Sequence, residues 1–221
     1  MIKENLNEIL ADIPENVTLV AVSKTKPASE IEEAYAAGQR VFGENKVQEM
    51  VEKEAVLPRD IQWHLIGHVQ TNKVKYIAPF VSVIHAVDSL KLLSEINKQA
   101  KKNNRTIKCM LQMHIADEES KFGMKFDELM EVLNSNELVE MQNVSIIGLM
   151  GMATFTDNEE QVREEFCNLE GDFNVIKSHF FKFNDNFKHI STGMSGDYKL
   201  AIEEGSTMVR IGSSIFGSRT K

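Results

Sequence analysis

The sequence predicts an α/β fold, a closed barrel of eight parallel strands that alternate with helices. Apolar runs of strand length alternate with helical stretches about eight times along the 221 residues, with no Pro/Gly/Ser-rich linker between them. Several of these runs are apolar on both faces, as a parallel sheet covered on both sides requires. Strand–helix alternation favours right-handed βαβ units, and eight units fit a single-domain (β/α)₈ barrel over residues 1–221.

A doubly wound open sheet is the alternative architecture. No GxGxxG follows the first strand, and the chain contains no GxxxxGK[ST] motif. The absence of both motifs weakens dinucleotide-binding and P-loop interpretations, which are common for open sheets.

The elements follow from residue types and spacing. Residues 1–12 form a short N-terminal helix with Ile2, Leu6, Ile9 and Leu10 on one face. Apolar, β-type runs predict strands at 18–24, 40–45, 61–67, 81–88, 106–116, 144–154, 187–192 and 207–217. Between them, polar stretches with helical periodicity predict helices at 27–38, 46–57, from 71, 89–102, 126–134, 158–179 and 197–204. Gly38 ends the first of these helices.

The composition excludes several classes of protein. Lys and Arg number 25 against 33 Asp and Glu, a net charge of −8, which argues against a nucleic-acid partner. A local basic pocket for a small anion remains compatible with this charge. Two cysteines exclude a disulfide scaffold and a four-cysteine zinc site. We see no secretory signal and no long apolar run, and so expect a cytoplasmic protein without a membrane partner.

Lys24 stands out because it ends an otherwise apolar strand, VAVSK. Active sites of these barrels lie at the carboxyl ends of the strands. Partial desolvation there disfavours the charged amine, and a neutral amine can form a Schiff base with an aldehyde. The alternative is a strand-end lysine that reaches solvent. Lys26 is a rival, but its position beside Pro27 predicts greater exposure.

Two glycine-rich segments follow the last two predicted strands, STGMSGD and VRIGSSIFG. Such loops often bind phosphate through backbone N–H groups and a helix N-terminus. Ser195 and Ser213 would add hydroxyl donors, and Gly212 would permit close backbone approach. Ordinary turn chemistry is the alternative explanation, since Gly and Ser are common in loops.

Arg210 lies within the last apolar strand, and a buried arginine needs a partner. It could reach the ring of a ligand whose phosphate is held near Gly212, or it could form a salt bridge with a barrel carboxylate such as Glu44. An aldehyde-reactive lysine, a phosphate cradle and a buried arginine together indicate pyridoxal 5′-phosphate, which carries both an aldehyde and a phosphate.

The sequence also resembles the YggS family of pyridoxal phosphate-binding proteins, the pyridoxal phosphate homeostasis proteins. The matching stretches are AVSKTKP, FGENKVQE, WHLIGHVQTNK, HAVDS, IADEESKFG, GLMGMAT and STGMSGDYKLAIEEGSTMVRIGSSIFG, which together run from residue 21 to residue 217. The resemblance implies a barrel like the N-terminal half of bacterial alanine racemase. Its departures at His68, Val69, Ala86 and His114 concern the pocket rim.

The resemblance also implies roles for individual residues. Lys24 matches the lysine that forms the internal aldimine, and Arg210 matches the arginine that faces the pyridine nitrogen. The phosphate-binding positions correspond to Ser195, Gly212 and Ser213, with neighbours at Thr192 and Met194, and Asn45 matches a polar residue near the ring hydroxyl.

We expect a monomeric protein that holds pyridoxal phosphate without vigorous catalysis and maintains its intracellular pool, with apo-enzymes as recipients. A guanidinium opposite the ring nitrogen disfavours its protonation and weakens the ring as an electron sink. Alanine racemases add a tyrosine base from a second domain, whereas none of Tyr35, Tyr76 and Tyr198 ends a predicted strand. A racemase of fold type III and a Schiff-base aldolase are the alternatives.

The remaining candidates for chemistry have simpler explanations. Four histidines lie on different strands without a paired acidic ligand, so we expect structural or rim roles and no metal site; they are His64, His68, His85 and His114. Cys109 and Cys167 lack a triad pattern and are expected to be inert. Methionines near the barrel mouth are more typical of core packing, namely Met150, Met152 and Met194.

Overall fold

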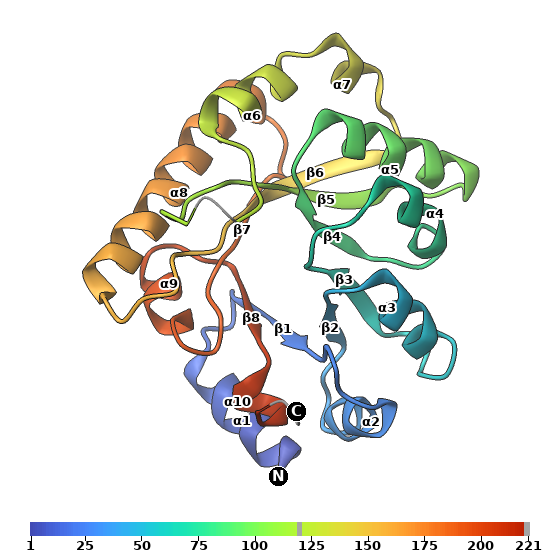
Figure 1. The fold of residues 1–221 in the computed structure, drawn as a ribbon, viewed down its shortest axis with the longest axis vertical. Coiled ribbons are helices and arrows are strands. Elements are labelled where there is room, and N and C mark those ends of the chain that lie inside the picture. The colour runs from blue at the N-terminus through green and yellow to red at the C-terminus, as the bar shows by residue number, and fades with distance from the viewer. Residues whose placement is uncertain (119–120, 219–221) are drawn as a thin grey trace.

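The computed structural model describes residues 1–118 and 121–218 and contains the predicted barrel (Figure 1). Eight parallel strands pair in chain order, and β1 closes the sheet by pairing with β8, which excludes the open sheet. The strands are β1 Thr18–Val22, β2 Val41–Glu44, β3 Gln62–Leu65, β4 Val83–Val87, β5 Ile107–Gln112, β6 Val144–Met150, β7 His189–Ser191 and β8 Met208–Ile211.

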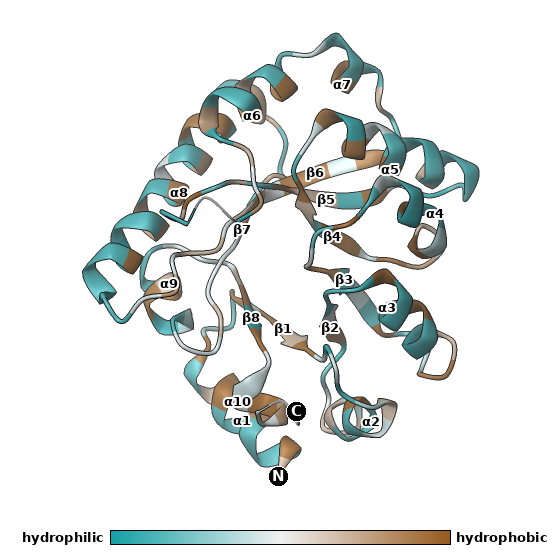
Figure 2. Ribbon diagram, viewed as in Figure 1, coloured by the Kyte–Doolittle hydropathy of each residue, from teal (hydrophilic) through white to brown (hydrophobic). Residues whose placement is uncertain are grey.

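Helices surround the barrel and turn their polar faces outward (Figure 2). The expected N-terminal helix is α1 Ile2–Asp12, which lies beside the last helix, α10 Ser213–Phe216, through a hydrogen bond from Asn5 Nδ2 to the carbonyl of Ile215 at 2.9 Å. The others are α2 Ala28–Ala36, α3 Val47–Glu54, the 3₁₀ helix η1 Thr71–Lys73, α4 Val74–Ile77, α5 Leu90–Lys102, α6 Phe126–Leu133, α7 Asn136–Glu140, α8 Glu159–Phe180 and α9 Tyr198–Glu203.

The structure corrects two of the predicted elements. The eighth strand ends at Ile211, and the apolar residues that follow form α10 instead of continuing the strand. The short helix α7 was not predicted; it begins at Ser135, whose hydroxyl accepts a hydrogen bond from the amide of Leu138 at 3.2 Å. Most strands are also shorter than predicted, because their pairing stops before the loops that carry the polar residues begin.

The core has two layers. A large apolar cluster fills the space between strands and helices and includes Phe42 and Trp63, whose ring centroids lie 6.2 Å apart. A smaller cluster fills the inside of the barrel with Val83, Met110 and Ile147. Buried polar side chains also lie in the molecule's interior, among them His64, His85, Ser191 and Arg210. Within the described ranges, no helix has the length and apolar character needed to cross a bilayer.

Candidate functional site

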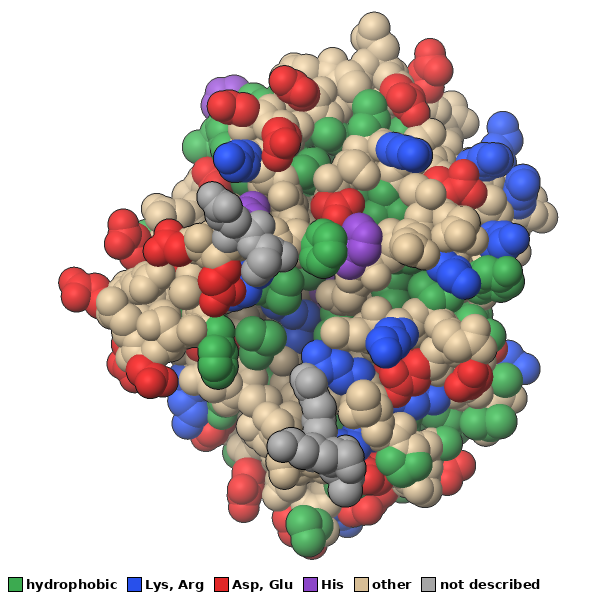
Figure 3. Space-filling model, viewed as in Figure 1, with side chains coloured by type: hydrophobic (Ala, Val, Ile, Leu, Met, Phe, Trp, Pro, Cys, Tyr) green, Lys and Arg blue, Asp and Glu red, His purple; other side chains and the backbone are tan. Residues whose placement is uncertain are grey.

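A cavity of about 690 Å³ lies at the carboxyl ends of the strands, and nearly all the predicted site residues line it. Those on its wall are Lys24, Asn45, Met194, Ser195, Arg210, Gly212 and Ser213. Lys and Arg side chains lie in and beside the central hollow of the face shown in Figure 3, whereas many acidic side chains lie near the outer edge. The cavity therefore offers positive charge within an acidic protein.

Lys24 lies in the turn that follows β1 and is half-buried. The next residue, Thr25, has a φ of +65°, an uncommon conformation for a β-branched residue. Lys26, expected to be the more exposed lysine, is half-buried as well. Its side chain is 11% exposed, and its Nζ donates to the carbonyl of Phe216 at 2.6 Å and faces Glu30 at 3.5 Å.

Arg210 enters the cavity from β8 and is almost fully buried. Its Nη1 donates to the carbonyl oxygen and the hydroxyl of Ser191, at 2.7 and 2.6 Å, and its Nη2 donates to the carbonyl of Gly151 at 3.0 Å. Burial lowers the pKa of Arg210 to about 10, which leaves it cationic at neutral pH. A salt bridge with Glu44, the alternative considered above, is wrong, because Glu44 pairs with Lys53 at 2.7 Å.

A chain of buried polar groups continues from Arg210 through the barrel. The hydroxyl of Ser191 lies 2.9 Å from Nδ1 of His85, and Nε2 of His85 lies 2.9 Å from Nδ1 of His64. Arginine only donates, so the Ser191 oxygen accepts from it, and the Ser191 hydroxyl and the two imidazole rings continue the chain through hydrogen bonds whose direction depends on the histidine tautomers. Burial lowers the pKa of His64 to about 3 and that of His85 well below its usual value. Both rings are therefore neutral at physiological pH.

The two glycine-rich loops lie against each other at the cavity wall. The amide of Gly212 donates to the hydroxyl of Ser195 at 3.3 Å, and the amide of Met194 donates to Asp197 Oδ1 at 2.5 Å. Gly193 has a φ of +93°, and a Cβ there would lie 2.6 Å from the Cβ of Ala201. The first loop therefore requires glycine at this position.

Gly212 brings the second loop close to β1, since a Cβ on it would lie 3.0 Å from the carbonyl oxygen of Val22. The amides of Ser213 and Ser214 open α10 and therefore have no acceptor within the helix. Asp197, which lines the same wall, was missed as a site residue, and burial raises its pKa.

Thr192 differs from the other predicted residues because it lies behind the cavity wall. It is 1% exposed, and its Oγ1 has no hydrogen-bond partner among the described residues. Its carbonyl accepts from the hydroxyl of Ser206 at 2.8 Å. An unsatisfied buried hydroxyl is uncommon in folded proteins, so the atom marks a place where a polar partner is to be expected.

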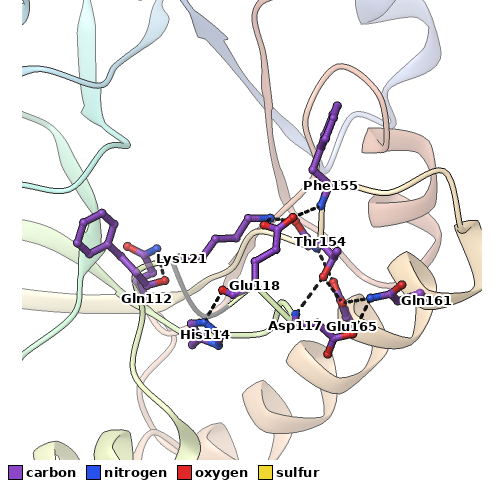
Figure 4. Close-up of polar contacts among 11 residues, drawn as sticks. Gln112, His114, Asp117, Glu118, Lys121, Thr154, Phe155, Gln161 and Glu165 are labelled. Carbon is purple, nitrogen blue, oxygen red and sulfur yellow. Dashed lines mark hydrogen bonds and ion pairs between the residues drawn. The ribbon is translucent and has the colours of Figure 1, made fainter.

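The opposite wall of the cavity was not predicted as a unit. Figure 4 shows the segment after β5 joined to the segment after β6 by polar contacts. Lys121 Nζ donates to the carbonyl of Ala153 at 2.5 Å, and the amide of Asp117 donates to the hydroxyl of Thr154 at 3.0 Å. Glu165 of α8 accepts from both the amide and the hydroxyl of Thr154 at 2.6 Å. These contacts join parts of the chain that are far apart in sequence, so no local pattern could reveal them.

His68 lies on the cavity wall, as its expected rim role requires. Its Nδ1 lies 3.0 Å from Oδ2 of Asp88, and its ring stacks on Phe122 with centroids 4.2 Å apart. Gln112 holds Phe122 in place by donating to its carbonyl at 2.9 Å. Neither Gln112 nor Phe122 was predicted as a site residue.

The other sequence candidates lie as follows. His114 faces the carbonyl of Glu118 at 3.1 Å, and no group of three or more potential metal ligands exists in the part of the chain that the structure describes. Burial raises the pKa of the Cys109 thiol, whereas Cys167 is exposed. Met150 is core as expected, Met152 packs against the same cluster and also lines the cavity, and Met194 lines the cavity.

Comparison with known proteins gives consistent results. The family model "Alanine racemase, N-terminal domain" matches residues 1–220. A pyridoxal phosphate homeostasis protein of Aquifex aeolicus is 40% identical over 91% of this chain and 86% of its own, and that of Escherichia coli K12 is 38% identical over 93% and 87%.

Solved structures also resemble this one. PipY of Synechococcus elongatus without pyridoxal phosphate is 35% identical with a TM-score of 0.92, covering 98% of this chain and 100% of that one. The same protein with pyridoxal phosphate bound has a TM-score of 0.89 at the same identity and coverage. Alanine racemase of Clostridium difficile shares the fold at 14% identity with a TM-score of 0.73, over 100% of this chain and 56% of its own.

Proposed function

This chain belongs to the family of pyridoxal phosphate homeostasis proteins, and from that premise we propose that it binds pyridoxal 5′-phosphate in the cavity at the barrel mouth. One observation carries the proposal. Lys24, Arg210 and the two glycine-rich loops all line the same cavity, although they come from opposite ends of the sequence. The function that follows is to hold the cofactor and thereby regulate its intracellular pool.

The side of the cavity at Arg210 fits a pyridine ring. Three of the five guanidinium N–H groups are used by Ser191 and Gly151, and the others have no acceptor among the described residues. A ring nitrogen that faced the guanidinium would accept a hydrogen bond and would stay unprotonated, because a proton there would place two like charges at short range. Arg210 would therefore orient the ring and lower its electron-withdrawing power.

The glycine-rich loops fit a phosphate. Gly212 lies close against β1, where a Cβ would make a tight contact with the carbonyl oxygen of Val22, and the amides of Ser213 and Ser214 begin α10 beside it. Ser195 and Ser213 add hydroxyl groups at the same wall, with Met194 as their neighbour. The buried Oγ1 of Thr192 has no partner among the described residues, and we propose it as a supporting polar group. Asn45, which follows β2, lines the same cavity, and we expect it to contact the ring hydroxyl.

Pyridoxal phosphate supplies an aldehyde that condenses reversibly with amines. Lys24, on the wall of the cavity after β1, provides the amine. The protein's role is then to bind, orient and release the cofactor rather than to turn over a substrate. No tyrosine lines the cavity within the described ranges; Tyr35 and Tyr198 bond instead to Asp60 and Asp12, at 2.7 and 3.1 Å.

We further propose that the protein acts as a cytoplasmic monomer and passes the cofactor to apo-enzymes. Its cavity is open at a rim that includes Phe122, Phe155 and Met194, which are 53%, 93% and 38% exposed. An exposed apolar rim around a ligand is a surface from which a partner can receive it. Both described cysteines are unpaired, as expected in a reducing compartment.

The first experiment is to add pyridoxal phosphate to the purified protein, record its visible absorbance, reduce with borohydride and map the modified peptide. We expect a new band and a pyridoxyl group on Lys24. The variant Lys24→Ala should show neither, whereas Lys75→Ala, at an exposed lysine outside the cavity, should behave as wild type. Absence of the band, or modification elsewhere, would contradict the proposal.

A racemase assay with alanine and other amino acids tests the proposed lack of vigorous catalysis. We expect no turnover approaching ~1 s⁻¹, the lower range of typical enzymes. Turnover at that rate would favour the racemase alternative, and His68, held by Asp88 on the cavity wall, would then be the first base to substitute.

A further inference from the structure

We propose that Lys53, together with Glu44 and Glu49, positions the backbone of Lys24 for its reaction with the cofactor aldehyde. These three residues, the Lys53 cluster, come from the end of β2 and from α3. None of them lines the cavity. The inference rests on the proposed function, because it concerns the lysine that this function uses.

The centre of the cluster is a buried ammonium group. The side chain of Lys53 is 8% exposed, and its Nζ donates to Glu44 Oε1 at 2.7 Å, to Glu49 Oε1 at 2.7 Å and to the carbonyl of Ser23 at 2.8 Å. An ammonium group has three protons, and all three are used here. Removing a charge from water is costly, so such a group persists only with this kind of full coordination.

The contacts of the cluster reach both neighbours of Lys24. On one side, the carbonyl of Ser23 accepts from Lys53, and its hydroxyl donates to Glu44 Oε1 at 2.6 Å. On the other side, the amide of Thr25 donates to Glu49 Oε1 at 2.5 Å. The peptide units before and after Lys24 are therefore both fixed to one ionic cluster.

The conformation of Thr25 indicates that the turn is under strain. A β-branched residue at φ +65° is about 1–2 kcal/mol less stable than in the usual regions, and it persists only where its surroundings impose it. The hydrogen bond from the Thr25 amide to Glu49 is a contact that imposes it. Without the cluster, the turn would relax and the direction of the Lys24 side chain would change.

This arrangement predicts a selective defect. Ring and phosphate are held by Arg210 and the glycine-rich loops, on the β7 and β8 side of the cavity, so binding of the cofactor body should survive disruption of the cluster. Bond formation at Lys24 should not, because misplacement of a reacting amine by about 1 Å can cost up to ~100-fold. The residues of the cluster are thus positioning residues that act through the backbone of Lys24.

The test uses the full chain and two ligands. Pyridoxal 5′-phosphate forms the bond to Lys24, whereas pyridoxine 5′-phosphate carries an alcohol in place of the aldehyde and binds without a bond. The variants are Lys53→Met and Glu49→Ala; the second guards against misfolding, because Glu49 is 22% exposed and its loss leaves the Lys53–Glu44 pair in place. Lys199→Met, at a surface lysine paired with Asp12, is the matched control.

We expect the rate of borohydride-trappable bond formation to fall about tenfold or more in Glu49→Ala and in Lys53→Met. The affinity for pyridoxine 5′-phosphate should stay within about twofold of wild type in folded protein, and Lys199→Met should change neither quantity. Unchanged bond formation in Glu49→Ala would overturn the inference, and so would a parallel loss of affinity for both ligands. If wild type forms no bond at Lys24, the proposed function itself fails, which is a distinct result.

Discussion

Two regions of the molecule's interior bury polar groups in opposite ways. Beside β1 and β2, the Lys53 cluster buries an ammonium against the carboxylates of Glu44 and Glu49. Beside β7 and β8, the cation is Arg210, and its partners are the neutral groups of Ser191 and Gly151, followed by the neutral rings of His85 and His64. Lys53 is neutralised by the carboxylates it contacts, whereas Arg210 has no carboxylate in direct contact among the described residues.

The difference shows which charge acts on a ligand. The charge of Lys53 is balanced by the two carboxylates that it contacts, so Lys53 contributes little to the electrostatic potential in the cavity. Arg210 is fully buried and has Asp197 only at longer range, so its charge remains uncompensated at the cavity wall. An anionic or electron-rich ligand at that wall would interact favourably with this positive charge. The first region thus positions the backbone of Lys24, and the second binds the ligand.

The substitution Lys53→Met is expected to have the largest effect on stability of those that test this comparison. Removing one partner of a buried ion pair leaves a buried charge on Glu44 and should lower the free energy of unfolding by about 3–5 kcal/mol. Thermal and urea denaturation measure this loss. The double variant Glu44→Met/Lys53→Met should recover most of it, because both charges are then absent; equal instability of single and double variants would contradict an ionic origin.

The pH dependence of stability tests the neutral histidines that follow Arg210 and Ser191. His64 and His85 stay neutral in the folded protein, whereas in the unfolded chain they take up protons below pH 6.5. Their depressed pKa values therefore make stability fall as the pH drops below 6.5, by about 2 kcal/mol for each residue at pH 5 relative to pH 7.5. Urea denaturation across this range measures the slope.

The control for this pH dependence is a pair of substitutions. His64→Gln keeps an amide that can donate to or accept from His85, and it should remove about half of the contribution of the two histidines. His179→Gln, at an exposed helix position, should leave the slope as in wild type. An acid slope that is unchanged in His64→Gln would show that the buried histidines are not its source.

The sequence predicted the barrel and one wall of the cavity because both depend on local patterns. The position of Lys24 after an apolar run and the glycine pairs after 191 and 211 can be read directly, and barrel topology then brings them together. The extension of the last strand to 217 was wrong for the same reason: GSSIF continues an apolar pattern, and periodicity alone does not separate a short helix from a strand.

Long-range polar pairing could not be predicted in this way. Glu44, Lys53 and Ser23 belong to three segments, and nothing in the spacing of Lys53 distinguishes it from the solvent-facing lysines of a charged helix. His64 and His85 were expected to be structural, yet the chain that connects them to Arg210 depends on which way strands β3, β4 and β7 turn their side chains. Such partners become visible only when the barrel register is known.

The smallest effect expected from the comparison concerns two buried serines. Ser191→Ala removes the hydroxyl that joins Arg210 to His85, but the guanidinium keeps the carbonyls of residues 191 and 151. The loss should therefore be only about 1–2 kcal/mol. Its distinctive readout is the ¹⁵N NMR signals of His85 and His64, since Nδ1 of His85 loses its hydrogen-bond partner.

Ser23→Ala is the matched variant in the other region, where an equally buried hydroxyl donates to Glu44. It should cost a similar amount and leave the histidine signals unchanged. If Ser23→Ala shifts those signals, or Ser191→Ala does not, the two regions are not independent networks. Unfolding data on both single variants and the double variant provide a second test, because independent networks give additive losses to within about 0.5 kcal/mol.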